Sequence, residues 1–132
     1  MAESMKLKVV APERIFYEGD VTFLEFTTTE GDMGIYPRHI PLTVIIAPGV
    51  LRIHEDGQVR EAALMSGFIE ILPDQVTILA ESVEWPEEID VNRAKEAEIR
   101  ARRRIEKGKG INLYRAEMAL KRSLLRQRLS NR

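Results

Sequence analysis

The chain contains 132 residues with a formal net charge of −1 at pH 7, and it has no cysteine. This length fits one domain or a small domain with an appendage, and the lack of cysteine excludes disulfides, a thiolate nucleophile and a cysteine-based metal site. Because no apolar run approaches the ~20 residues that cross a bilayer, we expect a cytoplasmic protein that reaches a membrane only through a partner.

The net charge conceals two parts of opposite sign. Residues 1–88 contain sixteen Asp/Glu and six Lys/Arg, whereas residues 89–132 contain five Asp/Glu and fourteen Lys/Arg. The first part therefore carries a formal charge of −10 and the second a charge of +9. A partner of the basic part is expected to be acidic or phosphorylated.

The acidic part is predicted to consist of short strands closed by turns. Runs rich in β-branched and aromatic residues occur near residues 7–9, 21–26, 44–46, 50–53, 64–65, 68–72 and 76–79. Between them lie the turn signals Gly19-Asp20, Gly31-Asp32, Pro48-Gly49, Asp56-Gly57 and Pro73-Asp74. This rhythm is typical of an antiparallel sandwich or barrel. The Asp56-Gly57 pair favours a type I′ hairpin because both residues tolerate a positive φ.

The sequence pattern changes near Trp85-Pro86, which divides the chain into a β domain, residues 1–86, and a helical domain, residues 87–132. Apolar residues then recur at helical spacing, first at Val91, Ala94, Ala97 or Glu98, Ala101 and Ile105, and later at Leu113, Ala116, Leu120 and Leu124. Gly108 or Gly110 is expected to end the first helix, and Asn112 to cap the second. These features predict an antiparallel two-helix hairpin, whose small apolar faces leave it able to move.

Arginine side chains form one stripe on each predicted helix. At about 100° per residue, the first stripe contains Arg93, Arg100, Arg104 and Lys107, and the second contains Arg115, Arg122 and Arg126. A solvated face is the ordinary interpretation of charged helical residues, but such a face usually mixes signs. Here arginines greatly outnumber carboxylates, which favours an anion shared by the two helices.

No catalytic motif occurs in the sequence. It lacks a phosphate-binding loop followed by Lys-Ser/Thr, a Gly-x-Ser-x-Gly elbow and a His-Glu-x-x-His pair. The two histidines, His39 and His54, have no neighbouring His, Cys or close carboxylate cluster, which disfavours a metal site. His54 is expected to be an exposed strand residue. We therefore do not expect the chain to be an enzyme.

Several segments together resemble the epsilon subunit of bacterial rotary ATP synthase. In the β domain they are Gly34-Ile35-Tyr36-Pro37-Arg38-His39-Ile40-Pro41, Ser66-Gly67-Phe68-Ile69-Glu70-Ile71 and Val76-Thr77-Ile78-Leu79-Ala80. In the helical domain they are Ile89-Asp90-Val91-Asn92-Arg93-Ala94 and Ala116-Glu117-Met118-Ala119-Leu120-Lys121-Arg122. The resemblance implies an N-terminal antiparallel β-sandwich followed by a C-terminal helical hairpin, in a non-catalytic subunit of the rotor.

The resemblance also implies partners for the β domain. In the family this domain sits on the gamma subunit and against the c-ring, which implies a peripheral protein at the cytoplasmic face of the bacterial cell membrane. The loop of residues 34–41 would lie toward the c-ring, and the implied contacts are Ile35, Tyr36, Arg38 and His39. An ordinary loop that closes the core is the alternative. Arg38 stands where the family more often has glycine.

For the hairpin the resemblance implies a regulatory role. Members of the family extend it along gamma into the catalytic ring of alpha and beta subunits, where basic residues meet an acidic segment of beta and block ATP hydrolysis. The implied inhibitory contacts are Arg100, Arg104, Arg115, Arg122, Arg126 and Arg128. Because the apolar faces of the hairpin are small, a ligand can shift the balance between folded and extended states.

The chain is also similar to a subset of the family, found in bacilli, that binds ATP in the folded hairpin. The pattern of this subset is present as Ile89-Asp90-x-x-Arg93-Ala94. The resemblance places Glu84, Asp90, Arg93 and Ala94 around the adenosine end of ATP, and Arg100, Arg122 and Arg126 at the phosphates. ATP would act as a regulatory ligand, with the participation of magnesium left open. The alternative is that Asp90 only caps the first helix.

Two other functions fit the sequence less well. A nucleic-acid or anionic-surface binding module would use the basic helices, but Tyr114 is the only aromatic residue in residues 89–132, so a base-stacking platform is missing. An independent ATP-hydrolysing enzyme would need a phosphate loop and metal ligands that the sequence lacks. We therefore expect no nucleic-acid partner.

Overall fold

The computed structural model describes residues 3–108 and 112–130, which form two compact units. The first unit is Met1–Val83 and the second is Glu84–Arg132. The strands are β1 (Met5–Ala11), β2 (Arg14–Val21), β3 (Phe23–Thr28), β4 (Gly31–Ile35), β5 (Leu42–Ile46), β6 (Gly49–Glu55), β7 (Gln58–Ile71) and β8 (Gln75–Glu84). They are followed by the 3-10 helix η1 (Pro86–Glu88) and the helices α1 (Val91–Lys107) and α2 (Leu113–Ser130).

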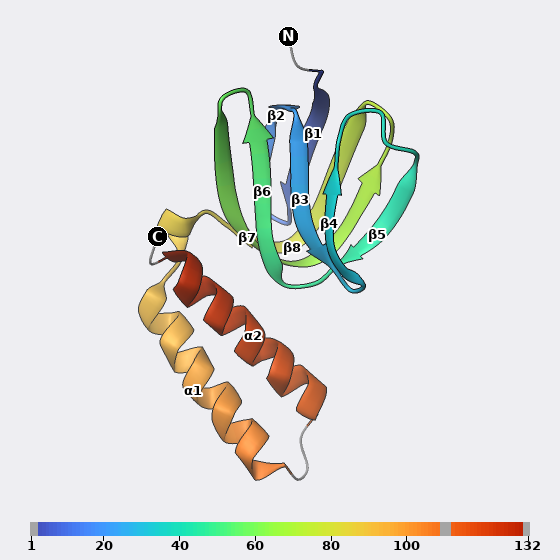
Figure 1. The fold of residues 1–132 in the computed structure, drawn as a ribbon. Helices are drawn as coiled ribbons and strands as arrows, with labels where there is room; N and C mark the ends of the chain where they lie inside the picture. The colour runs from blue at the N-terminus through green and yellow to red at the C-terminus, as the bar shows by residue number, and fades with distance from the viewer. Residues whose placement is uncertain (1–2, 109–111, 131–132) are drawn as a thin grey trace. The chain divides into compact units, whose positions relative to one another are not determined.

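The strands form a β-sandwich in the order β2-β1-β8-β7-β5-β3-β4, with β6 paired to both β3 and β7 (Figure 1). Alternating residues point inward, as in β3, where Leu24 and Phe26 are buried while Phe23 and Glu25 are half-exposed. This alternation fills the core with aliphatic side chains. The predicted sandwich is confirmed. One pairing is parallel, because β1 lies beside β8 with Leu7 opposite Val76.

The long strand β7 takes part in two pairings. Its residues 58–64 pair with β6 and its residues 67–71 pair with β5. The change of partner occurs next to Gly67, which has a φ of +133°. A Cβ atom at Gly67 would lie 2.0 Å from the carbonyl oxygen of Leu79. Only glycine therefore fits where β7 bends against β8.

Two strands and two turns differ from the sequence prediction. Of β2 only Val21 was predicted, and β4 was not predicted at all. Gly19-Asp20 is not a turn, because both residues pair with β1 inside β2. The Asp56-Gly57 hairpin is present, but only Gly57 has a positive φ, of 82°, so the turn is not type I′.

In the second unit, both predicted helix boundaries next to the link are confirmed. Gly108 has a left-handed φ of 66° at the end of α1, and its amide donates to the carbonyl of Arg104. The side chain of Asn112 accepts a hydrogen bond from the amide of Arg115 at the start of α2. The alternative stop, Gly110, lies outside the described residues.

The predicted apolar stripe is correct for α1 and partly correct for α2, where Ala116 is buried and Leu120 half-buried as expected. Ala94 and Ala101 are buried in α1 as expected. In α2 the buried residues are Ala116, Ser123, Leu125 and Leu129, while the predicted Leu113 and Leu124 are 46% and 41% exposed. Ser123 can be buried because its hydroxyl donates to the carbonyl of Leu120. In the described part of the chain, neither helix is long and apolar enough to cross a membrane.

Candidate functional site

The second unit contains an ion pair between two residues that the sequence assigns to one ligand. Glu84 ends β8 and Arg126 lies in the last turns of α2, and Oε1 of Glu84 is 2.6 Å from Nε of Arg126. Their side chains are 28% and 26% exposed. Partial burial weakens screening by water, so this pair is stronger than an ordinary surface pair.

Asp90 caps α1 at the same end of the hairpin. Its Oδ1 accepts a hydrogen bond from the amide of Arg93, and its carbonyl accepts one from the amide of Ala94. Ile89 and Ala94 are buried, which fixes the backbone on both sides of the cap. Asp90 itself is exposed. Asp90 therefore caps α1, and its exposed carboxylate remains accessible to a ligand.

The other arginines assigned to this ligand make no ion pair within the described residues. Arg93 and Arg100 lie seven residues apart on α1, and Arg122 precedes Arg126 by one turn of α2. Seven and four residues are both close to whole numbers of helical turns, so each pair shares one face. Of the eight predicted ATP-binding residues, only Glu84 and Arg126 form an ion pair with each other within the described part of the chain.

A polar contact that the sequence did not predict joins the two helices. Oε1 of Glu98 on α1 accepts a hydrogen bond from Gln127 on α2 at 2.8 Å, and Oε2 accepts one from Arg102 at 2.8 Å. These hydrogen bonds lower the pKa of Glu98, and the bond from Gln127 has the larger effect. Glu98 was predicted only as an alternative to Ala97 on the apolar stripe, so no signal in the sequence pointed to this bond.

The remaining inhibitory candidates lie on exposed helical surface. Arg104 belongs to the last turn of α1, Arg115 to the first turn of α2, and Arg128 to its last turn. None of these three makes an ion pair within the described residues. Positive charge at the end of α1 or α2 is favourable, because the carbonyl groups of a helix C-terminus carry partial negative charge. These arginines are available to an anionic partner.

In the loop after β4, the structure separates the four expected c-ring contacts. Ile35 is fully buried, so its assignment as a contact is a correction: it packs in the core opposite Leu24 and offers no surface. Tyr36 is 65% exposed and Ile40 is 74% exposed. The Tyr36 ring stacks on Phe23 with 4.3 Å between centroids. The loop thus presents an apolar surface, which Ile40 supplies in place of Ile35.

Arg38 has an unusual backbone conformation at the tip of this loop. Its φ is 68°, in the left-handed region that favours glycine. Its amide donates to the carbonyl of Pro73, and its guanidinium lies 3.2 Å from the carboxylate of Glu3. His39 bonds through Nδ1 to the carbonyl of Ile40. These contacts hold Arg38 in a conformation that glycine adopts without strain.

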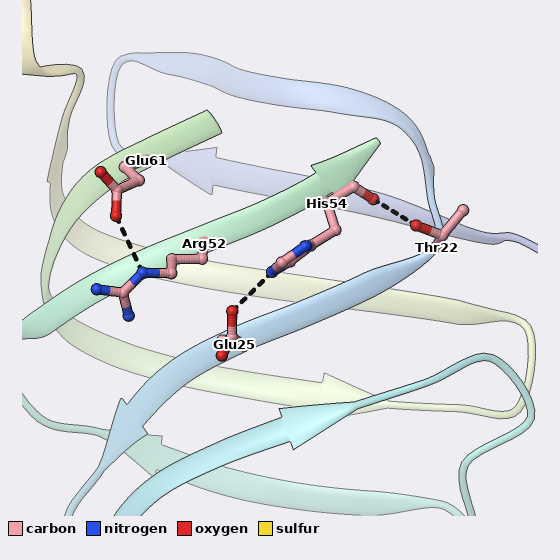
Figure 2. Close-up of polar contacts among 5 residues, drawn as sticks. All are labelled: Thr22, Glu25, Arg52, His54 and Glu61. Carbon is pink, nitrogen blue, oxygen red and sulfur yellow. Dashed lines mark hydrogen bonds and ion pairs between the residues drawn. The ribbon is translucent and has the colours of Figure 1, made fainter. Parts of the chain in front are cut away.

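Figure 2 shows a polar network on the outer face of β3, β6 and β7. Nε2 of His54 lies 2.6 Å from Oε2 of Glu25, and Arg52 donates to Glu61 at 2.9 Å. Thr22 donates to the carbonyl of His54. His54 is half-buried and has a carboxylate neighbour, unlike the exposed residue that was predicted. Among the described residues, no group of three potential ligands could hold a metal ion.

An apolar row crosses the outer face of the other layer. Ile45 pairs with Phe68, and Leu79 pairs with Val10, which pairs in turn with Ile15. Because β7 and β8 are neighbours in the sheet, these side chains form one row across five adjacent strands, from β5 to β2. Four of the five are exposed large apolar residues, and Val10 is half-buried. An exposed apolar surface of this extent is typical of a protein interface.

Family models match both units of the chain. Residues 4–86 match the beta-sandwich domain of the ATP synthase delta/epsilon chain, and residues 87–131 match its long alpha-helix domain. The ATP synthase epsilon chain of Caldanaerobacter subterraneus subsp. tengcongensis is 46% identical over 100% of this chain and 97% of its own length. That of Halalkalibacterium halodurans is 42% identical over 98% of each chain.

Solved structures share the fold at lower identity. A chain of the Euglena gracilis mitochondrial ATP synthase, in an assembly of OSCP, F1 and c-ring, has a TM-score of 0.79 at 22% identity, over 89% of this chain and 76% of that one. A chain of the Tetrahymena thermophila central stalk and c-ring has a TM-score of 0.68 at 14% identity, over 98% of both chains. The same fold is thus present in these two chains at low sequence identity. The chain belongs to the ATP synthase delta/epsilon chain family, and within it to the bacterial epsilon chains.

Proposed function

We propose that the chain is a non-catalytic, regulatory subunit of the ATP synthase central stalk, in which the helical hairpin inhibits ATP hydrolysis when it extends and ATP relieves this inhibition by binding the folded hairpin. Membership in the epsilon chains supports the place in the complex. The observation that carries the regulatory part is the arrangement at one end of the hairpin. There an accessible Asp90 carboxylate lies at the start of α1, and the Glu84–Arg126 pair involves the end of α2.

This arrangement has the chemistry that ATP requires. Carboxylates accept hydrogen bonds from the amino and hydroxyl groups of adenosine, and guanidinium groups match phosphate oxygens in pairs of parallel bonds. Arg93, Arg100 and Arg122 have no intramolecular anion within the described residues, so they can bind phosphate without first breaking an ion pair. ATP bound only to the folded hairpin stabilises that state by ~1.4 kcal/mol at about tenfold excess over Kd.

The β-sandwich supplies two contact surfaces in this proposal. The apolar row of Ile45, Phe68, Leu79, Val10 and Ile15 docks on the gamma subunit, because burial of exposed apolar side chains is favourable. The loop with Tyr36, Arg38, His39 and Ile40 contacts the c-ring. Through these contacts the subunit is held at the cytoplasmic face of the bacterial cell membrane, with the complex as its only link to the membrane.

Calorimetry on the isolated wild-type chain tests the nucleotide site. We expect ATP to bind with one site per chain, with and without added magnesium, and the double variant Asp90→Ala, Arg93→Ala to bind much more weakly. The proposal of a regulatory ATP site is wrong if the wild-type chain does not bind ATP, or if the double variant binds it unchanged.

A further inference from the structure

Two neighbouring rows of side chains cover the outer face formed by β4, β3, β6 and β7. The first row contains Tyr36, Phe23 and His54. Phe23 pairs with His54 on β6, and Tyr36 follows Ile35, which pairs with Leu24, the residue after Phe23. The second row runs across the strands from Gly34. Gly34 pairs with Glu25, Glu25 with Arg52, and Arg52 with Glu61. The first row is aromatic and the second is mainly charged.

Phe23 lies between two aromatic partners in the first row. Its centroid is 4.3 Å from that of Tyr36 and 5.0 Å from that of the His54 ring. Because β4 and β6 flank β3 on opposite sides, the two partners also lie on opposite sides of Phe23. A Cβ atom at Gly34 would lie 2.7 Å from the Phe23 ring, so that ring occupies the space above the glycine. The position of the Tyr36 ring is thereby linked to that of His54.

The bond between His54 and Glu25 connects the two rows diagonally (Figure 2). A neutral imidazole can donate one hydrogen bond to the Glu25 carboxylate, and an imidazolium adds to that bond the attraction between two opposite charges. An imidazolium also interacts favourably with the face of an adjacent aromatic ring. Both effects fix His54 against Phe23 more firmly when the ring is charged.

From this geometry we infer that His54 is a positioning residue for the loop that carries Tyr36, acting through Phe23, and that the charge of His54 sets how firmly the exposed Tyr36 surface is held. The inference rests on the c-ring contact proposed above and concerns how that surface is presented. Histidine is the side chain whose charge ordinarily changes between about pH 5 and 8. The loop is expected to be held most firmly on the acid side of that range.

The charged and titratable groups that share this face with His54 are few. Glu25 comes from β3, Arg52 from β6, Glu61 from β7 and Tyr36 from the residue after β4. Asp32 of β4 lies farther along the same face, where it accepts a hydrogen bond from Thr27. Arg52 is bonded to Glu61, and its charge does not change in the physiological range. Histidine is the only side chain whose charge ordinarily changes between about pH 5 and 8. A change at Tyr36 between pH 5 and 8 is therefore assigned to a histidine.

The chain has only two histidines, which gives the experiment a matched control. Ring signals of Tyr36 and of the histidines are followed by NMR on the isotope-labelled full chain from pH 5 to 8. We expect the Tyr36 signals to shift with the same midpoint as those of His54. The shift should vanish in His54→Gln, whose amide can still donate to Glu25, and persist in His39→Gln. A Tyr36 shift that persists in His54→Gln, or no shift in the wild type, overturns the inference.

A second variant tests the route through Phe23. In Phe23→Leu we expect the Tyr36 signals no longer to respond to pH, and a continued response of Tyr36 contradicts the route. The c-ring contact is tested separately with Tyr36→Ser in the reconstituted complex, which should reduce ATP-driven proton pumping relative to hydrolysis. Unchanged pumping in that variant would reject the c-ring contact but not the NMR result, so the two failures are distinguishable.

Discussion

Glu84 and Arg126 lie 42 residues apart in the sequence and form an ion pair of 2.6 Å between Oε1 and Nε. The pair links the last residue of β8 to the last turns of α2, within one compact unit. The Glu84 carboxylate thus pairs with the guanidinium that we propose to bind phosphate. Binding of ATP must displace this carboxylate or share Arg126 with it, so the pair sets part of the ATP affinity.

Arg126→Ala is expected to weaken both the hairpin and nucleotide binding. The variant leaves Glu84 without its partner and removes a charge-assisted bond to phosphate. We expect a loss of about tenfold in ATP affinity, or ~1.4 kcal/mol, and about 1 kcal/mol in the stability of the helical unit. Calorimetry and thermal unfolding measure the two effects. Arg103→Ala, an exposed arginine outside every candidate set, is the control, and an equal effect of both variants contradicts the prediction.

Asp90 variants separate capping from ligand binding. Asp90→Ala removes the bond to the Arg93 amide and should destabilise the start of α1 by about 1 kcal/mol. Asp90→Asn retains a capping oxygen but loses the charge, so circular dichroism should show nearly wild-type stability. If the carboxylate also binds ATP, calorimetry should show weaker binding in both variants. Wild-type ATP affinity in Asp90→Asn would leave Asp90 with the capping role alone.

Glu98 makes the stability of the hairpin dependent on pH. Its bonds to Gln127 and Arg102 lower its pKa, so they stabilise the folded hairpin above the unfolded pKa. This stability is lost as the pH falls below about 4.3 and through the folded pKa. We expect the thermal midpoint of the wild-type helical unit to exceed that of Glu98→Gln at pH 7, and the difference to shrink by pH 3. A difference that does not depend on pH would contradict the role of the Glu98 charge.

Gly67 is the glycine where substitution should be most damaging. In Gly67→Ala the new Cβ meets the backbone oxygen of Leu79 at 2.0 Å, and an L-residue is strained at a φ of +133°. We expect a loss of about 3 kcal/mol in unfolding free energy. Gly57→Ala, with a φ of +82° and no atom within 4 Å of the new Cβ, should lose only about 1 kcal/mol. Chemical denaturation gives both values, and equal losses would contradict the packing argument.

Arg38→Gly should leave the β-sandwich as stable as the wild type or make it more stable. The substitution relieves about 1 kcal/mol of left-handed strain and removes only an exposed ion pair with Glu3. Arg38→Ala removes the same ion pair but keeps the strain, so it should be less stable than Arg38→Gly. Thermal unfolding compares the two, and the reverse order would contradict the account of this loop.

The sequence predicted the elements whose signals are local. Asp90, Gly108 and Asn112 act on residues within one turn of themselves, and each has the role expected from its chemistry. β2 and β4 were missed because Gly19 and Gly31 read as turn residues, whereas Gly19 pairs with β1 and Gly31 begins a strand. Their strand conformation is imposed by partners elsewhere in the sheet.

The sequence indicated which residues to consider for each candidate site, but it did not indicate which of them contact one another. The arginine stripes followed from helical spacing, yet the spacing could not show that Arg126 is already paired with Glu84. Ile35 belongs to the same loop motif as Tyr36, and only the register of β4 shows that it points into the core. The bond between Glu98 and Gln127 forms only if each helix is rotated about its own axis so that the two side chains face each other, and the sequence of polar residues does not determine that rotation.

ATP hydrolysis by the assembled complex tests the regulatory role most directly. Complexes with the full chain are compared with complexes whose chain lacks residues 89–132, over ATP concentrations that span the Kd of the isolated chain. We expect the full chain to lower hydrolysis at low ATP, and the difference to close as ATP rises above that Kd. Equal hydrolysis by the two complexes at every ATP concentration would contradict an inhibitory hairpin that ATP regulates.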